Sequence, residues 1–229
     1  MKVLLINGSP KAAGNTAAAL AEMRAVFERE GIEVEYVHVG HLDIRGCTGC
    51  GTCYKTGKCV TDDIVNEIAP LFEACDGCVV GSPVYYASPN GALLALLDRL
   101  FYSTPFDKRM KVGASVAVAR RGGCSATFDE LNKYFTICGM PVASSQYWNS
   151  VHGREEGECV EDFEGMQSVR TLAENMSFLV KSIALGKEKN ENPTFPVASG
   201  SVFYYCDSGV GSRTESVGFI DCLYFPGKR

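Results

Sequence analysis

Short apolar runs alternate with amphipathic segments along residues 1–187, and this alternation constrains the fold more than any other feature. Runs expected to form strands cover residues 2–7, 32–39, 77–83, 111–119 and 140–148. Segments with apolar residues at helical spacing cover residues 15–31, 62–75, 88–101, 124–139 and 163–186. Strands that alternate with helices form a parallel sheet with right-handed crossovers. We therefore expect an α/β three-layer sandwich.

Five such units match the flavodoxin-like doubly wound order, with a five-stranded parallel sheet in the order 2-1-3-4-5. In that order the chain reverses between strands one and three, and a ligand should bind where the loops after strands one, three and four meet. Trp148, Asn149 and His152 fall near the carboxyl end of the expected fifth strand, where we expect structural roles for them. The core domain can close within residues 1–187. Residues 188–229 mix polar and aromatic stretches, and we expect a C-terminal extension, either an arm against another subunit or a tail.

The loop after the first strand reads NGSPKAAGNT and opens the first helix. Backbone N–H groups and the positive end of the helix dipole favour a phosphate at such a junction. Ser9, Asn15 and Thr16 can add side-chain donors, and Lys11 adds a charge. The loop lacks the G-K-[ST] ending of a nucleotide P-loop and the G-x-G-x-x-G motif of a dinucleotide-binding fold. A plain strand-to-helix turn would carry similar residues, so this loop alone does not define a site.

Two further loops are expected at the same edge of the sheet. GSPVYYASPNG brackets a turn with prolines and presents aromatic rings, which offer a flat wall to a planar ligand. ARRGGCS has glycines that allow close backbone approach and arginines that can bind a ring edge or a phosphate. The residues singled out are Pro83, Val84, Tyr85, Tyr86, Arg120, Arg121, Gly122 and Gly123. Each loop alone could be an ordinary surface turn that binds no ligand. Three such loops at one edge of the sheet favour a single ligand site.

The charge balance excludes several classes of partner. The chain has 22 basic and 27 acidic residues, a net charge of −5, and no basic run, which argues against nucleic acid and an anionic membrane surface. The N-terminal apolar run is too short for a secretory signal, and no segment reaches membrane-spanning length. A cytoplasmic location is expected, where the 11 cysteines stay reduced unless they bind metal or do redox chemistry.

Four cysteines lie within residues 46–60, at Cys47, Cys50, Cys53 and Cys59, with the spacing C-x2-C-x2-C-x5-C. A disulfide knot, a zinc site and an iron–sulfur cluster are the competing readings. A reducing compartment disfavours the first, and zinc sites usually pair two distant C-x2-C knuckles. Successive C-x2-C steps are typical of cubane iron–sulfur ligation. Cysteines that hold no metal remain a further alternative.

The motifs GSPKAAGNT, GSPVYYASPNGALLALLDR and RRGG resemble those of the NAD(P)H-dependent FMN reductases of flavodoxin-like fold, over roughly residues 1–187. This resemblance implies that the FMN phosphate is held by Ser9, Lys11, Asn15 and Thr16. It implies that the isoalloxazine ring is lined by Pro83, Val84, Tyr85, Tyr86, Arg121, Gly122 and Gly123. CTGCGTCYKTGKC is similar to the motif of the iron–sulfur flavoprotein branch, which implies a [4Fe-4S] cluster on Cys47, Cys50, Cys53 and Cys59.

The resemblance implies an FMN-dependent oxidoreductase with NAD(P)H as electron donor. Flavin converts two-electron into one-electron chemistry, and basic hydride transfer requires no acid–base side chain. A small molecule or a protein would donate and accept the electrons, and subunits would pair as a homodimer or homotetramer. Two rivals are an electron carrier reduced by a ferredoxin-type partner and a non-catalytic flavin or redox sensor.

Overall fold

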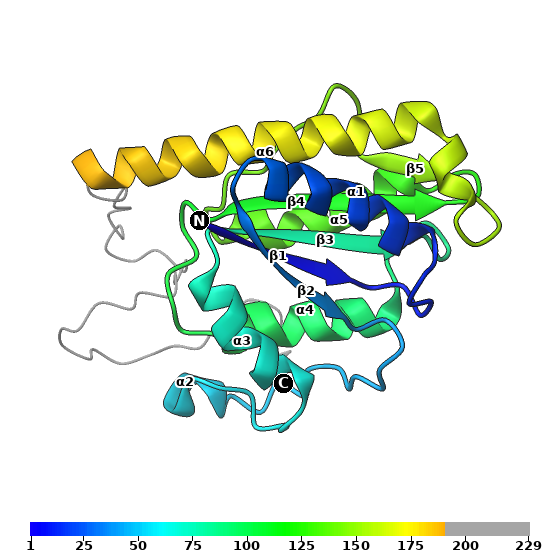
Figure 1. Cartoon of the computed structure of the whole chain (residues 1–229). Coiled ribbons are helices and arrows are strands. Elements are labelled where there is room, and N and C mark those ends of the chain that lie inside the picture. The colour runs from blue at the N-terminus through cyan, green and yellow to red at the C-terminus, as the bar shows by residue number, and fades with distance from the viewer. Residues whose placement is uncertain (191–229) are drawn as a thin grey trace, which may run out of the picture.

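The computed structural model describes residues 1–190 and contains one parallel sheet (Figure 1). Its strands are β1 (Lys2–Asn7), β2 (Glu33–His38), β3 (Gly77–Pro83), β4 (Val112–Ala119) and β5 (Ser150–His152). Neighbouring strands follow the order β2-β1-β3-β4-β5, and all four pairings are parallel. This is the flavodoxin-like order, and the sequence-based prediction of the fold is confirmed.

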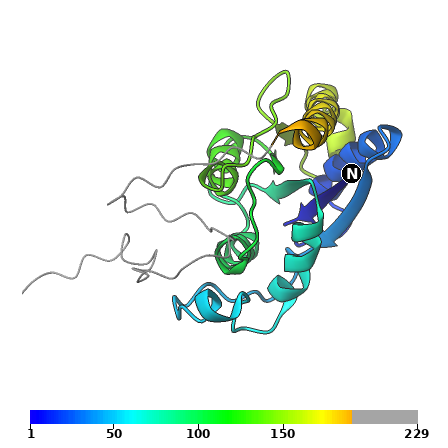
Figure 2. The ribbon, with the colours of Figure 1, turned by 90° about the vertical axis from the view of Figure 1, so that its left-hand side faces the viewer.

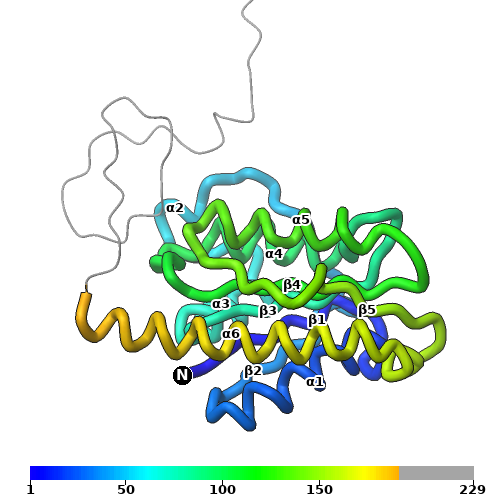
Figure 3. Tube along the Cα trace, turned by 90° about the horizontal axis from the view of Figure 1, so that it is seen from above, coloured from blue at the N-terminus to red at the C-terminus, as the bar shows by residue number. Residues whose placement is uncertain are grey.

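Helices cover both faces of the sheet. They are α1 (Asn15–Arg29), α2 (Cys53–Thr56), α3 (Ile64–Ala74), α4 (Gly91–Ser103), α5 (Cys124–Ile137), the 3-10 helix η1 (Glu158–Glu161) and α6 (Phe163–Lys189). The end-on view and the view from above show α1 and α6 on one face and α4 and α5 on the other (Figures 2 and 3). The predicted long helices form with ends shifted by a few residues, whereas the sequence did not predict α2 and η1.

The apolar runs of the sequence correspond to strands that are buried in the structure. Every residue of β4 and all but the last residue of β3 are buried, because helices cover both sides of these central strands. β2 lies at the sheet edge, and its residues are exposed or half-buried. Each face has its own core, with Phe27 under α1 and α6, and Phe72 and Phe135 under α3, α4 and α5. Gly113 of β4 lets α5 approach, since a Cβ there would lie 2.4 Å from the ring of Phe135.

The prediction of the fifth strand was wrong in its position. The segment 140–148 touches β4 only at its start, where the carbonyl of Pro141 accepts from Gly113 N at 2.8 Å and Ala143 N donates to Gly113 O at 2.9 Å. It then leaves the sheet, because its polar residues bond to α6: Ser145 Oγ donates to Ser168 O at 2.6 Å. The chain rejoins β4 at 150–152, so Trp148 and Asn149 precede β5 rather than end it.

The closing helix α6 continues to Lys189, slightly beyond the predicted end of the core domain. Residues 191–229, nearly all of the predicted C-terminal extension, lie outside the described residues. Within residues 1–190, no helix combines the length and apolarity needed to cross a membrane.

Candidate flavin and thiol sites

The three predicted loops meet at the carboxyl edge of the sheet. β1 and β3 are neighbours there, and Gly8 N donates to Gly81 O at 2.8 Å across the junction. The loops after β3 and β4 touch, because a Cβ at Gly123 would lie 2.9 Å from both Ala87 Cα and Val84 Cγ1. Gly123 also has φ +95°, a conformation that favours glycine. The crevice expected at the reversal of strand order is therefore built from these loops.

Side chains from β1 and β2 form hydrogen bonds with the backbone of the first loop. Ser9 N donates to Asn7 Oδ1 at 2.9 Å, and His38 Nε2 lies 2.6 Å from Ser9 O. The amide of Lys11 donates to Ser9 Oγ at 3.2 Å. The Ser9 hydroxyl donates to no acceptor in the part of the chain that the structure describes, so its proton can go to a ligand. The Lys11 side chain is exposed.

The start of α1 has hydrogen-bond donors that no side chain in the described part of the chain accepts from. Gly14 caps the helix and supplies no side chain, so the first backbone N–H groups lack a side-chain partner. Thr16 is buried, and its methyl group lies against Gly81, where a Cβ would be 3.0 Å away. Within residues 1–190, the Thr16 hydroxyl has no hydrogen-bond partner. Free N–H groups and the helix dipole at this point favour an anion such as a phosphate.

Asn15 has a structural task that the sequence did not predict. Its Nδ2 donates to Glu155 O at 2.9 Å, and its Oδ1 accepts from Cys159 N at 3.2 Å. The side chain therefore ties the segment after β5 to the start of α1. A phosphate contact from Asn15 would have to use the second hydrogen of its amide group.

The second loop forms a two-residue turn. Tyr85 N donates to Ser88 O at 2.8 Å and Ser88 N donates to Tyr85 O at 3.0 Å. Tyr86 and Ala87 have φ of 52° and 61°, values that cost energy in non-glycine residues and often occur at functional sites. Tyr86 is fully exposed and Tyr85 is 46% exposed. The turn thus holds two aromatic side chains outside the core, free to contact a ligand.

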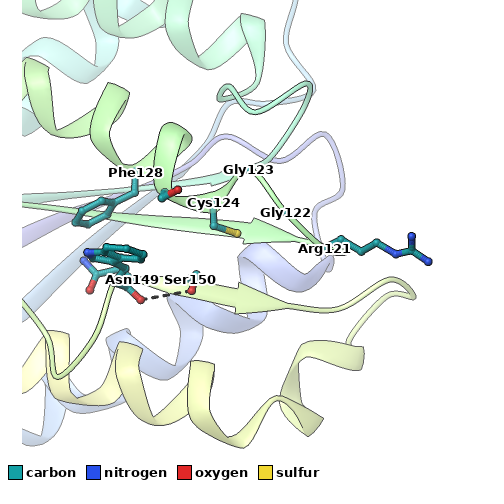
Figure 4. A pocket seen from close by; sticks show the side chains of 9 residues that line it. Arg121, Gly122, Gly123, Cys124, Phe128, Asn149 and Ser150 are labelled. Atoms are coloured by element: carbon teal, nitrogen blue, oxygen red, sulfur yellow. Dashed lines mark hydrogen bonds between the residues drawn. The ribbon is translucent and has the colours of Figure 1, made fainter.

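A hollow of about 190 Å³ lies beside the third loop, between α5 and the start of β5 (Figure 4). Its lining residues are Arg121, Gly122, Gly123, Cys124, Ser125, Phe128, Trp148, Asn149 and Ser150. In Figure 4 the Arg121 side chain extends away from the hollow. Three predicted ring-binding residues line this hollow, whereas the first and second loops do not. The hollow therefore adjoins the predicted flavin crevice on its β5 side.

The four clustered cysteines carry free thiols. Cys47 and Cys50 are exposed, and Cys53 and Cys59 are half-buried. Burial raises the pKa of the Cys53 thiol, and the charges of the other three cysteines raise it further. Four thiols in one short segment are ligands of the kind that iron–sulfur and zinc centres use. Among residues 1–190, however, no three His, Cys, Asp or Glu side chains are gathered closely enough to hold a metal ion.

Arg99 of α4 anchors this cysteine segment. Its Nε and Nη2 both lie 3.2 Å from Cys59 Sγ, and its side chain is only 2% exposed. Asp63 accepts from Nη1 at 2.7 Å and from Nη2 at 2.8 Å, and this pairing raises the pKa of the guanidinium. The carbonyls of Arg45 and Thr61 each accept at 3.1 Å. Arg99 was not among the site residues predicted from the sequence, although a lone arginine among the leucines of an apolar helix was a usable signal.

The cysteine segment lies away from the three loops. Tyr54 packs edge-on against Tyr102 at 5.4 Å between ring centroids, and Gly57 lies against Pro105, both near the end of α4. Since α4 runs back from the carboxyl edge, its end lies toward the amino ends of the strands. Figure 1 shows α2 at the lower left, while the strand arrows point to the right. Within one chain, the thiols and the flavin crevice are thus separated.

The strand order and the three loops define a flavodoxin-like α/β protein with a ligand crevice at the reversal point of its sheet. The chain belongs to the NADPH-dependent FMN reductase family, whose family model matches residues 1–155. It is therefore a flavin-dependent oxidoreductase of this family, whose cofactor is FMN. This agrees with the family predicted from the sequence motifs.

Relatives and solved structures extend this comparison. The chain is 34% identical over 194 residues to an iron-sulfur flavoprotein of Methanocaldococcus jannaschii, covering 80% of this chain and 99% of the relative. It is 30% identical over 193 residues to an iron-sulfur flavoprotein of Methanosarcina thermophila, covering 82% and 100%. Among solved structures, RosB with bound 8-demethyl-8-formylriboflavin-5'-phosphate superposes with a TM-score of 0.63 at 15% identity, covering 94% and 99%.

Proposed function

We propose that the protein takes electrons from a reduced nicotinamide or another donor onto FMN and passes them through a [4Fe-4S] cluster to an acceptor. The observation that carries this proposal is the meeting of three loops at the reversal of strand order, in a chain of the FMN reductase family. FMN supplies the conversion between two-electron and one-electron transfer when it is bound.

In this proposal the chain positions FMN through its own loops. The free N–H groups at the start of α1, with the hydroxyls of Ser9 and Thr16, hold the phosphate, and Lys11 adds a positive charge. The backbone at Gly122 and Gly123 and the side chain of Arg121 would help to hold the ring. The ring contacts come from Pro83, Val84, Tyr85 and Tyr86. The strained turn at Tyr86 supports this arrangement, because such backbone persists where its surroundings and function demand it.

The cluster would be held by Cys47, Cys50, Cys53 and Cys59. Support comes from the successive C-x2-C spacing, from the mutual effect of the thiols on Cys53, and from the two relatives named as iron-sulfur flavoproteins. Arg99 would donate two N–H groups to the Cys59 sulfur and offset part of the negative charge of the centre. Ligation would require the four sulfurs to lie closer together than they do in this structure.

Electrons would pass between the two cofactors across a subunit interface. The cysteine segment packs near the end of α4, away from the loops at the carboxyl edge. A homodimer or homotetramer that brings the cysteine segment of one subunit to the flavin crevice of its partner would close this gap. Light scattering that gives a mass above the 24.7 kDa of one chain supports this part of the proposal.

The proposal is tested on protein purified without oxygen. Iron and sulfide assays together with the absorption spectrum report both cofactors. Adding NADH or NADPH should bleach the flavin band, followed by reduction of an added one-electron acceptor. Bleaching by reduced ferredoxin but by neither nicotinamide would instead identify an electron carrier. A flavin that no donor reduces would overturn the oxidoreductase proposal.

We expect Thr16→Val to weaken FMN binding about ten- to hundredfold, because a hydrogen bond to a charged phosphate contributes roughly 1.5–3 kcal/mol. Valine keeps the methyl group that lies against Gly81, and the hydroxyl bonds nothing else within residues 1–190. The free energy of unfolding of the FMN-free protein should therefore change little. Fluorescence titration with FMN measures the affinity. An unchanged dissociation constant would remove Thr16 from the phosphate site.

A further inference from the structure

The segment that follows β2 packs directly against the first loop. The amides of Val39 and Gly40 both donate to the carbonyl of Asn7, at 2.9 and 3.3 Å. A Cβ at Gly40 would lie 2.1 Å from Gly8 O, which is too close for any side chain, so the two backbones are in contact. The first loop therefore has a fixed neighbour on its β2 side.

Asn7, the last residue of β1, holds the amide of Ser9. Asn7 is fully buried, and its Oδ1 accepts from Ser9 N at 2.9 Å. Its Nδ2 donates to the hydroxyl of Tyr36 in β2 at 2.8 Å. These two contacts fix the orientation of the amide group, because the reversed orientation would place Nδ2 against a second donor, Ser9 N. One side of Ser9 is thus held by the end of the sheet.

His38, the last residue of β2, holds the other side of Ser9. Its Nε2 lies 2.6 Å from Ser9 O. A carbonyl oxygen only accepts, so Nε2 carries a proton and donates it. Because Pro10 has no N–H, this carbonyl is the only hydrogen-bonding group of the Ser9–Pro10 peptide. Within the described residues no other group donates to it, so the orientation of this peptide depends on His38.

The orientation of that peptide decides where the Ser9 hydroxyl points. The amide of Lys11 donates to Ser9 Oγ at 3.2 Å, which leaves the hydroxyl proton for another acceptor. Ser9 Oγ also lies beside the cap of α1, since a Cβ at Gly14 would be 3.6 Å from it. The N–H groups at this helix start favour an anion. A rotation of the Ser9–Pro10 peptide would therefore move the hydroxyl away from a phosphate bound there.

We propose that His38 is a positioning residue that makes the crevice prefer FMN over riboflavin. The inference rests on the proposed FMN site, and it gives a role to a residue that contacts the loop rather than the ligand. The bond from Nε2 to Ser9 O holds the loop in its binding conformation before FMN arrives, so less conformational freedom is lost on binding. Riboflavin carries the same ring without the phosphate, so its affinity should not depend on this bond.

Fluorescence titration of the FMN-free protein with FMN and with riboflavin measures the two affinities. His38→Leu removes the donor and should weaken FMN binding about three- to tenfold, the usual contribution of one hydrogen bond. Riboflavin should bind this variant as it binds the wild type. His38→Gln can place its own Nε2 donor near the same point and should restore most of the FMN affinity.

His41 provides the matched control. Its ring lies 4.3 Å from the ring of His38 between centroids, and the residue is exposed. Within residues 1–190 its side chain forms no hydrogen bond with the first loop. His41→Leu removes a histidine next to His38 but keeps the bond to Ser9 O, so both flavins should bind this variant as they bind the wild type.

Hydrogen exchange of the FMN-free protein gives a readout that does not depend on any ligand. The amides of Ser9 and Lys11 both donate within the loop, so their exchange rates report how well it is ordered. A peptide that covers residues 5–14 should exchange faster in His38→Leu than in the wild type, and His38→Gln should resemble the wild type. Equal exchange in all three proteins would overturn the inference.

The titrations separate this inference from the proposed function. A wild-type protein that binds neither FMN nor riboflavin would contradict the proposed flavin site itself. A wild type that prefers FMN, with the same preference in His38→Leu, would leave the flavin site standing and remove His38 from its role. Equal losses of FMN and riboflavin affinity in His38→Leu would also overturn the inference, because a general structural defect would produce them.

Discussion

Arg99→Met should lower the free energy of unfolding by about 3–5 kcal/mol, the usual cost of removing one partner of a buried ion pair. The substitution leaves Asp63 without its bidentate partner and frees the carbonyls of Arg45 and Thr61. Methionine fills much of the same space as arginine. The decrease in the free energy of unfolding therefore comes from the missing charge and hydrogen bonds rather than from a cavity. Urea denaturation of the metal-free protein under reducing conditions measures it.

An exposed ion pair gives the matched control. Arg24 pairs with Glu28 one turn along α1, and both side chains are about half exposed at 50% and 53%. Arg24→Met should cost no more than about 0.5 kcal/mol, as for exposed pairs at this spacing. The double variant Asp63→Asn with Arg99→Met should regain part of the lost stability, because no charge is left unpaired. A loss below about 1 kcal/mol for Arg99→Met alone would mean that this cluster of bonds does not anchor the cysteine segment.

The sheet was predictable because its central strands are buried on both faces. β3 and β4 read as unbroken apolar runs, and glycines or polar loops mark their ends. The position of β5 was not predictable in the same way. Segment 140–148 has the composition of a strand, but hydrogen bonds from Ser145 and Asn175 join it to α6 and draw it off the sheet. Such long-range competition leaves no local signal.

The site was predictable to the extent that it rests on local loops. The turn residues and glycines at the ends of β1, β3 and β4 indicated where a ligand would bind, and the sheet order brings them together. Contacts between distant residues were not predictable. Asn15 meets Cys159 across 144 positions, and Arg99 meets Cys59 across 40. The 4.0 Å contact between Cys124 Sγ and His152 Nε2 likewise depends on where β5 starts, which the sequence placed wrongly.

Cys53→Ser should remove most of the iron from protein made without oxygen while FMN binding stays intact. Cys53 is the third of the four clustered cysteines, and it begins α2 with a half-buried thiol. A serine hydroxyl is a poor substitute for a thiolate ligand of iron. The segment lies away from the three loops at the carboxyl edge, so the substitution should not alter the affinity of the crevice for FMN. Iron assays and FMN titration measure the two effects separately.

The same variant should slow electron transfer to a one-electron acceptor far more than reduction of the flavin by the donor, because the chain would then lack the relay beyond FMN. Cys138→Ser is the control, because Cys138 lies at the end of α5, outside the cysteine segment, and its loss should leave iron content unchanged. If iron content and one-electron transfer both survive in Cys53→Ser, Cys53 is not a ligand. If wild-type protein made without oxygen contains no iron, the relay does not exist, and the chain works as an FMN reductase without a cluster.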